Sequence, residues 1–213
     1  MPRRSLLPLL LLTLAMPSVH AASPEIETGW ILSKLARPAP MRTQFVELHG
    51  SRLLKAPLRI EGEYARPNDD TLVREVRLPY AETSTIRAGS VTIKRGTSSH
   101  TYSLDRAPQL AGLQSSFGAL LSGDRTQLER AFRIDSSGSR EQWTLQLTPK
   151  DKRTATYVRT IALYGRGAEL RCIETTPAKG DLQRTLLAGA AQSASGVADA
   201  ASLTTLCHGA ATR

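Results

Sequence analysis

The sequence predicts an α+β protein that is mainly β, built on one strongly curved antiparallel sheet with helices packed as a lid on its concave face. Short runs of alternating apolar and polar residues recur between turn residues, which is the pattern of a meander and not of strand–helix–strand units. Two amphipathic helical patterns interrupt the meander and a third precedes it. A single bent sheet that receives the helices covers all of these apolar faces.

Composition narrows the class of protein. The 213 residues carry a formal net charge of +9, and 40% of them are hydrophobic, which describes a globular chain. Aromatic residues make up only 5%, which argues against a surface that stacks nucleic-acid bases. For that reason we expect no nucleic-acid partner. The two cysteines and four histidines are scattered, without the spacing of a metal site, and we expect no cofactor. The positive residues are dispersed, as on a solvated surface, although docking on an anionic membrane or an acidic partner is the alternative.

Residues 1–22 have the layout of a cleavable signal peptide. Arg3 and Arg4 precede an apolar run, and the small residues Val19 and Ala21, on either side of His20, have the usual spacing for cleavage after Ala21 or Ala22. The apolar run is about ten residues, whereas a membrane-spanning helix needs about twenty, so removal is favoured over a retained anchor. We therefore expect a periplasmic protein of a Gram-negative type of envelope, without a stable membrane anchor.

The first half of the mature chain predicts one helix and then strands. The helix is expected to begin at Ser23 and to end before Arg37, because apolar residues recur at helical spacing and Pro38 disfavours helix at the residue before it. Strands are expected at 45–48, 58–64, 71–78, 84–87, 91–94 and 100–104.

The second half begins with two helices. Leucines and a phenylalanine over 110–121 share one helix face, and Gly123 ends that helix. Asp124 is a predicted N-cap for a short helix that buries Leu128, Ala131 and Phe132. Further strands are expected at 143–147, 157–164, 169–174 and 181–187.

The chain after Leu187 has little to bury. Residues 188–213 are mostly Ala, Ser, Gly and Thr, so we expect a C-terminal tail that is largely mobile, with a weak helix over 197–206. Residues 23–187 then form one domain. Cys172 and Cys207 both lie in the exported part, where disulfides form, but the sequence does not decide whether they pair.

Several short strings resemble a known family. They are Phe45 in the first strand, Gly62–Asn68, Thr85–Gly89 and Leu147–Lys150. In this order, and after an export signal, they resemble the LolA family of periplasmic carriers of outer-membrane lipoproteins, in a divergent LolA-related branch, over about residues 26–187. The resemblance implies an open, incomplete β-barrel that holds acyl chains in its cavity and acts as a monomer. It also implies an inner-membrane exporter and an outer-membrane acceptor as partners, with a lipoprotein or another acyl lipid as cargo.

The resemblance gives Arg66 a role. The matching arginine of the family holds the helical lid shut through hydrogen bonds and makes release of cargo possible, and a guanidinium suits this because it offers five donors in a rigid fork. Asp69 and Asp70 follow where the family has a large apolar residue, so one of them is expected to pair with Arg66.

The expected cavity lining combines the apolar face of the sheet with the helix over 110–121. For each residue, ordinary core packing is the alternative. The residues are Leu58, Ile60, Tyr64, Trp143, Leu145 and Leu147 from the sheet, and Leu110, Leu113, Phe117 and Leu120 from the lid.

Two other functions remain open from the sequence. One is a regulatory or assembly module that senses lipid or lipoprotein on the same scaffold. The other is an exported hydrolase that uses Ser98 or Ser99 with His100 and Asp105, but the strand–turn–helix context of a nucleophile is missing there. We therefore expect a binding protein and not an enzyme.

Overall fold

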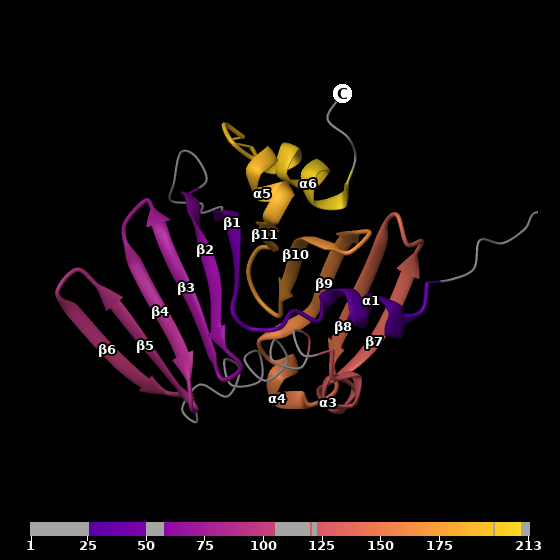
Figure 1. Ribbon diagram of the computed structural model, residues 1–213, viewed down its shortest axis with the longest axis horizontal. Helices are drawn as coiled ribbons and strands as arrows, with labels where there is room; N and C mark the ends of the chain where they lie inside the picture. Colours follow the sequence, from indigo (N-terminus) through magenta and orange to yellow (C-terminus); the bar gives the residue numbers. More distant parts are fainter. Residues whose placement is uncertain (1–25, 50–57, 105–119, 121–122, 198, 210–213) are drawn as a thin grey trace, which may run out of the picture.

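The computed structural model describes residues 26–49, 58–104, 120, 123–197 and 199–209. In this part of the chain, eleven strands form one antiparallel sheet in the order β6-β5-β4-β3-β2-β1-β11-β10-β9-β8-β7 (Figure 1). Strands β6 and β7 are the two edges, so the sheet is open and not closed into a barrel, as the sequence predicted.

The elements follow the predicted order. The strands are β1 (Met41–His49), β2 (Leu58–Asn68), β3 (Thr71–Leu78), β4 (Glu82–Arg87), β5 (Ser90–Arg95), β6 (Ser98–Ser103), β7 (Phe132–Gly138), β8 (Trp143–Pro149), β9 (Val158–Arg166), β10 (Glu169–Pro177) and β11 (Gln183–Leu187). The helices are α1 (Thr28–Leu35), α3 (Arg125–Ala131), α4 (Lys152–Ala155), α5 (Ala188–Ser193) and α6 (Ala200–His208).

Two meanders of consecutive strands make up the sheet. Strands β1–β6 form the first and β7–β11 the second, and they lie on either side of the β1–β11 pair (Figure 1). This pair, which we call the seam, aligns Phe45 with Leu187 and Val46 with Leu186. All other ladders join strands that are neighbours in the sequence, so the seam is the long-range pairing of the sheet.

Alternation along the central strands gives the sheet two apolar faces. Residues directly opposite each other on paired strands share a face, so Phe45 and Leu187 lie on one face and Val46 and Leu186 on the other. We call the first the α1 face, because its core includes the helix α1, and the second the α6 face, because its core includes α5 and α6.

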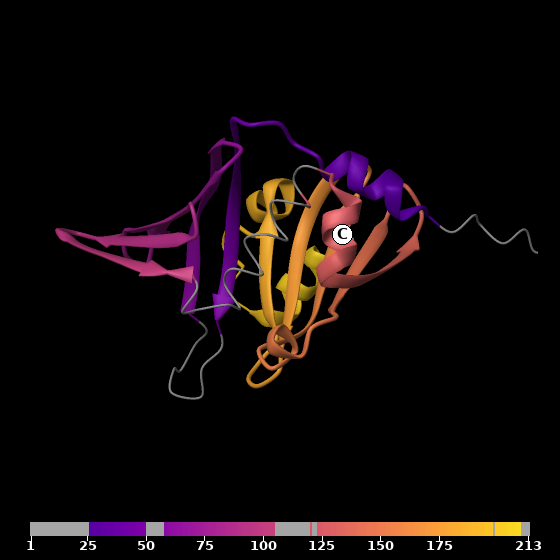
Figure 2. The same cartoon turned by 90° about the horizontal axis from the view of Figure 1, so that it is seen from below.

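The α1 face carries the larger core. Helix α1 buries Ile31, Leu32 and Leu35 against it, and α3 adds the fully buried Leu128. Figure 2 shows α1 and α3 lying beside the strands of the second meander. The predicted helix cap at Asp124 is present, because its side chain accepts a hydrogen bond from the Gln127 amide at 2.9 Å.

The segment after Leu187 differs from the expected mobile tail. It folds into α5 and α6, and α6 overlaps the range 197–206 in which a weak helix was predicted. Ala190, Ala194 and Leu203 are at most 1% exposed on the α6 face. Alanines have little surface of their own to bury, but they let a helix backbone approach a sheet closely, and composition alone does not reveal that contact.

Two further elements were not predicted. Strand β7 begins at Phe132, which the sequence places equally well on the buried face of the preceding helix, and it continues into a serine-rich edge with few apolar residues. Helix α4 is a single turn capped by Asp151. Within the described residues α1 begins at Thr28, and the expected start at Ser23 lies outside them, as does most of the predicted helix over 110–121.

None of the helices in the described part of the chain has the length and apolar character that a membrane crossing requires.

Candidate functional site

An apolar cavity of about 490 Å³ lies on the α1 face and crosses the seam. Strands β1–β4 form one wall, and β10, β11 and the end of α1 form the other. Its volume falls within the roughly 300–1,000 Å³ that is usual for ligand pockets. The larger apolar side chains in its lining are Leu35, Met41, Tyr64, Leu72, Ile86, Leu120, Leu170, Ile173 and Leu187.

The strand registers explain why these residues meet. Tyr64 lies opposite Arg74 on β3, and Leu72 lies opposite Ile86 on β4, so they occupy the same face of three adjacent strands. Phe45 continues that face and packs against Tyr64, with ring centroids 4.7 Å apart. The wall is therefore a mainly apolar surface that includes a few polar side chains.

One buried charge pair is built into this wall. The Glu47 carboxylate is 7% exposed and accepts hydrogen bonds from Arg74 at 2.9 Å and Thr185 at 3.1 Å, so it is compensated. The Tyr64 hydroxyl donates to it at 3.4 Å. Burial, with the Glu47 charge adding to it, raises the pKa of Tyr64 well above its ordinary value, so the phenol stays neutral.

Arg66 lies at the end of the cavity near α1 and is 7% exposed. Its guanidinium donates to the Arg37 carbonyl at 2.8 Å and pairs with Asp69 at 2.7 Å. The pairing with one of the two following aspartates was expected. Arg37 belongs to the connector between α1 and β1, and its own guanidinium donates to the Ala168 carbonyl at 3.0 Å. Arg66 therefore ties the α1–β1 connector to β2.

A family model for outer membrane lipoprotein carrier proteins that are LolA-like matches residues 20–210. The chain belongs to this LolA-like family. Among solved structures, a LolA superfamily protein from Nitrosomonas europaea is similar at 13% identity, with a TM-score of 0.38, over 73% of this chain and 74% of the other. LprF from Mycobacterium bovis is also similar at 13% identity, with a TM-score of 0.32, over 76% of this chain and 91% of the other. The comparison with curated proteins found no match.

The structure separates the cavity residues predicted for this LolA-like protein into groups. Tyr64 and Leu120 line the cavity. Ile60, Trp143, Leu145 and Leu147 are buried in the core of the α1 face, and the half-buried Leu58 packs against that core. None of these five is among the described lining residues of this cavity. Helices α1 and α3 pack against strands of the second meander and share a buried cluster with Trp143, Leu145 and Leu147. Leu110, Leu113 and Phe117 lie outside the described residues.

Sequence reasoning missed several lining residues. Leu72, Ile86, Ile173 and Leu187 lie on predicted strands, and alternation already placed them on one face of each strand. Pairing the strands in order would have aligned Leu72 and Ile86 with Tyr64, but only the seam brings Leu187 to the same place.

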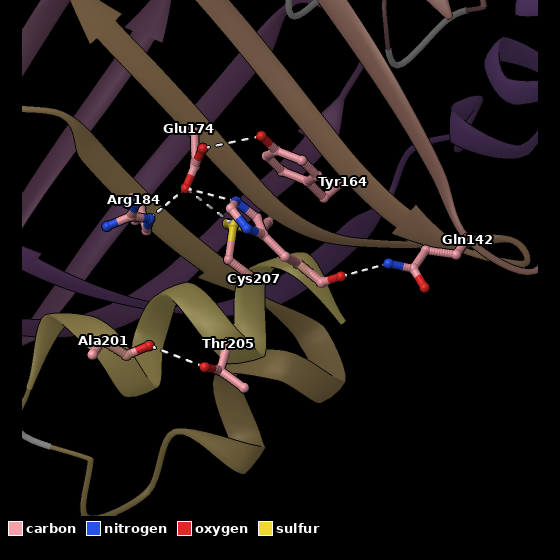
Figure 3. A network of polar contacts seen from close by, with 9 residues as sticks. Gln142, Tyr164, Glu174, Arg184, Ala201, Thr205 and Cys207 are labelled. Atoms are coloured by element: carbon pink, nitrogen blue, oxygen red, sulfur yellow. Dashed lines mark hydrogen bonds and ion pairs between the residues drawn. A yellow bond between two sulfur atoms is a disulfide. The ribbon is translucent and has the colours of Figure 1, made fainter. Parts of the chain in front are cut away.

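A second polar cluster of the LolA-like chain lies on the α6 face (Figure 3). Cys172 and Cys207 form a disulfide that joins β10 to α6. Next to it, the Glu174 carboxylate accepts from the Tyr164 hydroxyl at 3.1 Å, lies 3.2 Å from a ring nitrogen of His208, and pairs with Arg184. Burial and the Glu174 charge raise the pKa of Tyr164 to about 12.

This second cluster fixes α6 to the sheet. Glu174, Cys207 and His208 offer ligand atoms within 4.8 Å of one another, but the sulfur of Cys207 is bonded to Cys172 and the carboxylate is shared with Arg184. Gln142 adds a bond from its side chain to the His208 carbonyl at 2.6 Å. The contacts thus hold the end of α6 against β9, β10 and the residue that precedes β8.

The residues considered for a hydrolase do not form a site in the described structure. Ser98, Ser99 and His100 are exposed on the edge strand β6, and the ring of His100 faces Tyr102 with centroids 6.5 Å apart. Asp105 lies outside the described residues. The arrangement lacks the buried, oriented base that a serine nucleophile needs.

Proposed function

We propose that this LolA-like protein is a periplasmic carrier that takes the acyl chains of a lipoprotein or another lipid into the cavity across the seam. It carries them from the inner towards the outer membrane and releases them unaltered. The observation that supports the proposal is the apolar cavity itself, in a chain that belongs to a lipoprotein-carrier family.

The energetics suit a carrier. Transfer of a methylene group from water into an apolar site is worth about 0.8 kcal/mol, so ten methylenes contribute about 8 kcal/mol before the costs of association. Binding of this kind needs no directional contacts, and it tolerates chains of different length. The Glu47 carboxylate and the Arg74 guanidinium of the wall are paired with each other, so a hydrocarbon chain leaves neither of these two charges without a partner.

The test is to fill the cavity. Ile86 is half-buried and lines it, so Ile86→Trp places a larger side chain where the acyl chain would lie. We expect the wild-type protein purified from the periplasm to carry lipid in native mass spectrometry, and Ile86→Trp to carry at least fivefold less. Leu182→Trp is the matched control, because Leu182 is 38% exposed and does not line the cavity.

Thermal unfolding of both variants distinguishes a filled cavity from a damaged fold. Lipid-free wild-type protein that also fails to take up added acyl lipid would refute the proposal. Equal lipid content in the wild type and the folded Ile86→Trp variant would show that the cargo binds outside this cavity.

A further inference from the structure

The lining of the cavity is unevenly charged. Lys34, Arg37, Arg42, Arg66 and Arg74 all contribute to it, whereas Glu169 is the acidic residue among its described lining residues. An acyl chain alone needs none of these charges. A charge of the lining can indicate a ligand only if no charge of the protein already neutralises it.

Three of the five cations have acidic partners. Arg42 pairs with Glu63 on the neighbouring strand. Arg66 pairs with Asp69 at 2.7 Å, and Arg74 pairs with Glu47 at 2.9 Å. These three are structural links of the sheet and its turns.

Glu169 is also engaged elsewhere. One of its carboxylate oxygens accepts a hydrogen bond from the Gly189 amide at 2.7 Å, and the other lies 3.9 Å from the Arg171 guanidinium. Its charge is therefore directed to the start of α5 and to β10. It does not pair within 4 Å with a described cation of the cavity lining.

Lys34 and Arg37 are different. Neither forms an ion pair with an acidic residue in the part of the chain that the structure describes. The Lys34 ammonium lies 5.7 Å from the centre of the Trp30 ring, and Arg37 donates only to the Ala168 carbonyl in this part. Arg37 is exposed and Lys34 half-buried, so they mark the rim where α1 leads into β1.

We infer that Lys34 and Arg37 form an anion subsite at the rim of the cavity, and that the preferred cargo is an acyl chain whose head group is a carboxylate or a phosphate. The inference rests on the proposed function, since it places the hydrocarbon in the cavity below them. An anion at the head of the chain meets two uncompensated cations beside a region of low dielectric constant, where charge interactions are stronger than in water. A neutral head group gains nothing from them.

The experiment compares probes that share one hydrocarbon chain. Palmitate carries a carboxylate, hexadecyl phosphate carries a phosphate, and 1-palmitoylglycerol is neutral. Binding to delipidated full-length mature protein is measured by competition in native mass spectrometry at low salt. We expect one or both anionic probes to bind about fivefold to tenfold more tightly than the neutral one, as two partly exposed ion pairs would give.

The double variant Lys34→Gln with Arg37→Gln should lose this preference while it keeps its affinity for 1-palmitoylglycerol. The charge-matched control is Lys94→Gln with Lys179→Gln, because both lysines are exposed and lie outside the cavity lining. Circular dichroism melting shows whether the variants fold.

Each result decides between the two claims. A preference for only one of the anionic probes supports the subsite and identifies its head group. Equal binding of all three probes, or an unchanged preference in the double variant, overturns the anion subsite but leaves the carrier function standing. Failure of all three probes to bind refutes the carrier function and the subsite with it.

Discussion

At the scale of residues, two aromatic side chains of the α1 face lie over glycines on the neighbouring strand. Phe45 is paired with Gly62, and Trp143 is paired with Gly165. A Cβ atom on Gly165 would come within 1.9 Å of the Trp143 indole, and one on Gly62 would come within 2.8 Å of the Phe45 ring and 2.0 Å of the Glu75 carbonyl oxygen. Each glycine therefore makes room for a large ring that the core needs.

The substitution Gly165→Ala should destabilise the protein by about 1–3 kcal/mol, because the fully buried Trp143 must move in a well-packed core. The measurement is the free energy of unfolding in urea. Gly29→Ala is the control: it lies inside α1 with nothing within 4 Å of its added methyl, and it should stabilise by about 0.5–1 kcal/mol. A neutral Gly165→Ala would contradict the tight contact between ring and backbone.

Arg66 offers a second test at this scale. In the structure its guanidinium binds the α1–β1 connector through the Arg37 carbonyl. We propose that this contact favours the form of the protein that has released its cargo. Arg66→Leu removes that polar contact and adds apolar surface to the cavity. We therefore expect the variant to bind acyl cargo but to pass it on to acceptor vesicles severalfold more slowly.

The measurement is the rate at which a fluorescent fatty acid leaves the protein for vesicles. Arg66→Lys keeps the charge without the five-donor fork, so its rate should fall between those of the wild type and the leucine variant. An unchanged rate in Arg66→Leu would remove Arg66 from the release step.

At the scale of elements, α5 and α6 show how a segment of small residues becomes part of the fold. Ala190 and Ala194 approach the sheet closely, and the disulfide ties α6 to β10. All of this occurs on the α6 face, whereas the cavity lies on the other side of the same strands. The stability of α6 and the binding of cargo should therefore be separable.

Reduction of the Cys172–Cys207 disulfide tests this separation. The two cysteines are 35 residues apart, and releasing a loop of that size costs about 3–4 kcal/mol of stability in the chain-entropy model. We expect the melting temperature to fall in dithiothreitol, while lipid bound below that temperature stays on the protein. A double Cys→Ser variant should be less stable from the outset and insensitive to dithiothreitol, and loss of lipid on reduction alone would show that the two faces are coupled.

At the scale of the whole molecule, each face of the sheet contains a phenol beside a carboxylate. Tyr64 faces Glu47 on one side, and Tyr164 faces Glu174 on the other. Both phenols have a pKa in the folded protein above the ordinary value of about 10, and that of Tyr164 is about 12. The folded state therefore holds these protons more tightly than the unfolded state does.

The sign of the pH effect follows from linkage. The stability from these two phenols is fully present below pH about 10 and is lost as the pH rises from there through the folded-state values. We expect the free energy of unfolding to fall over this alkaline range, and to fall less steeply in Tyr164→Phe. Urea titrations at a series of pH values measure both slopes, and identical slopes would contradict the role of Tyr164.

Much of the fold could be predicted from the sequence, because alternation is a local signal. Trp143, Leu145 and Leu147 identify their strand unaided, and Asp124 with Gln127 identifies a helix start. Strand β7 escaped prediction because Phe132 fits a helix face as well as a strand. The pairing of Cys172 with Cys207 escaped it because a bridge depends on the distance between two elements.

The candidate site was less predictable for the same reason. Alternation shows which residues face inward, but not whether the space in front of them is filled. Trp143 and Tyr64 look alike in this respect, yet α1 and α3 cover the strands around the first, while the second borders a cavity. The lining also contains residues from both meanders. No local sequence pattern predicts that Leu187 pairs with Phe45.

The seam also has a kinetic consequence. Within each meander, each strand pairs with the next strand in the sequence, so these hairpins can form early and quickly. The pairing of Phe45 with Leu187 requires closure of a loop over most of the chain, so it forms later. The cavity that crosses the seam is complete only after this pairing. A chain that emerges with its N-terminus first thus exposes one side of β1 as an open edge until its last strand has been made.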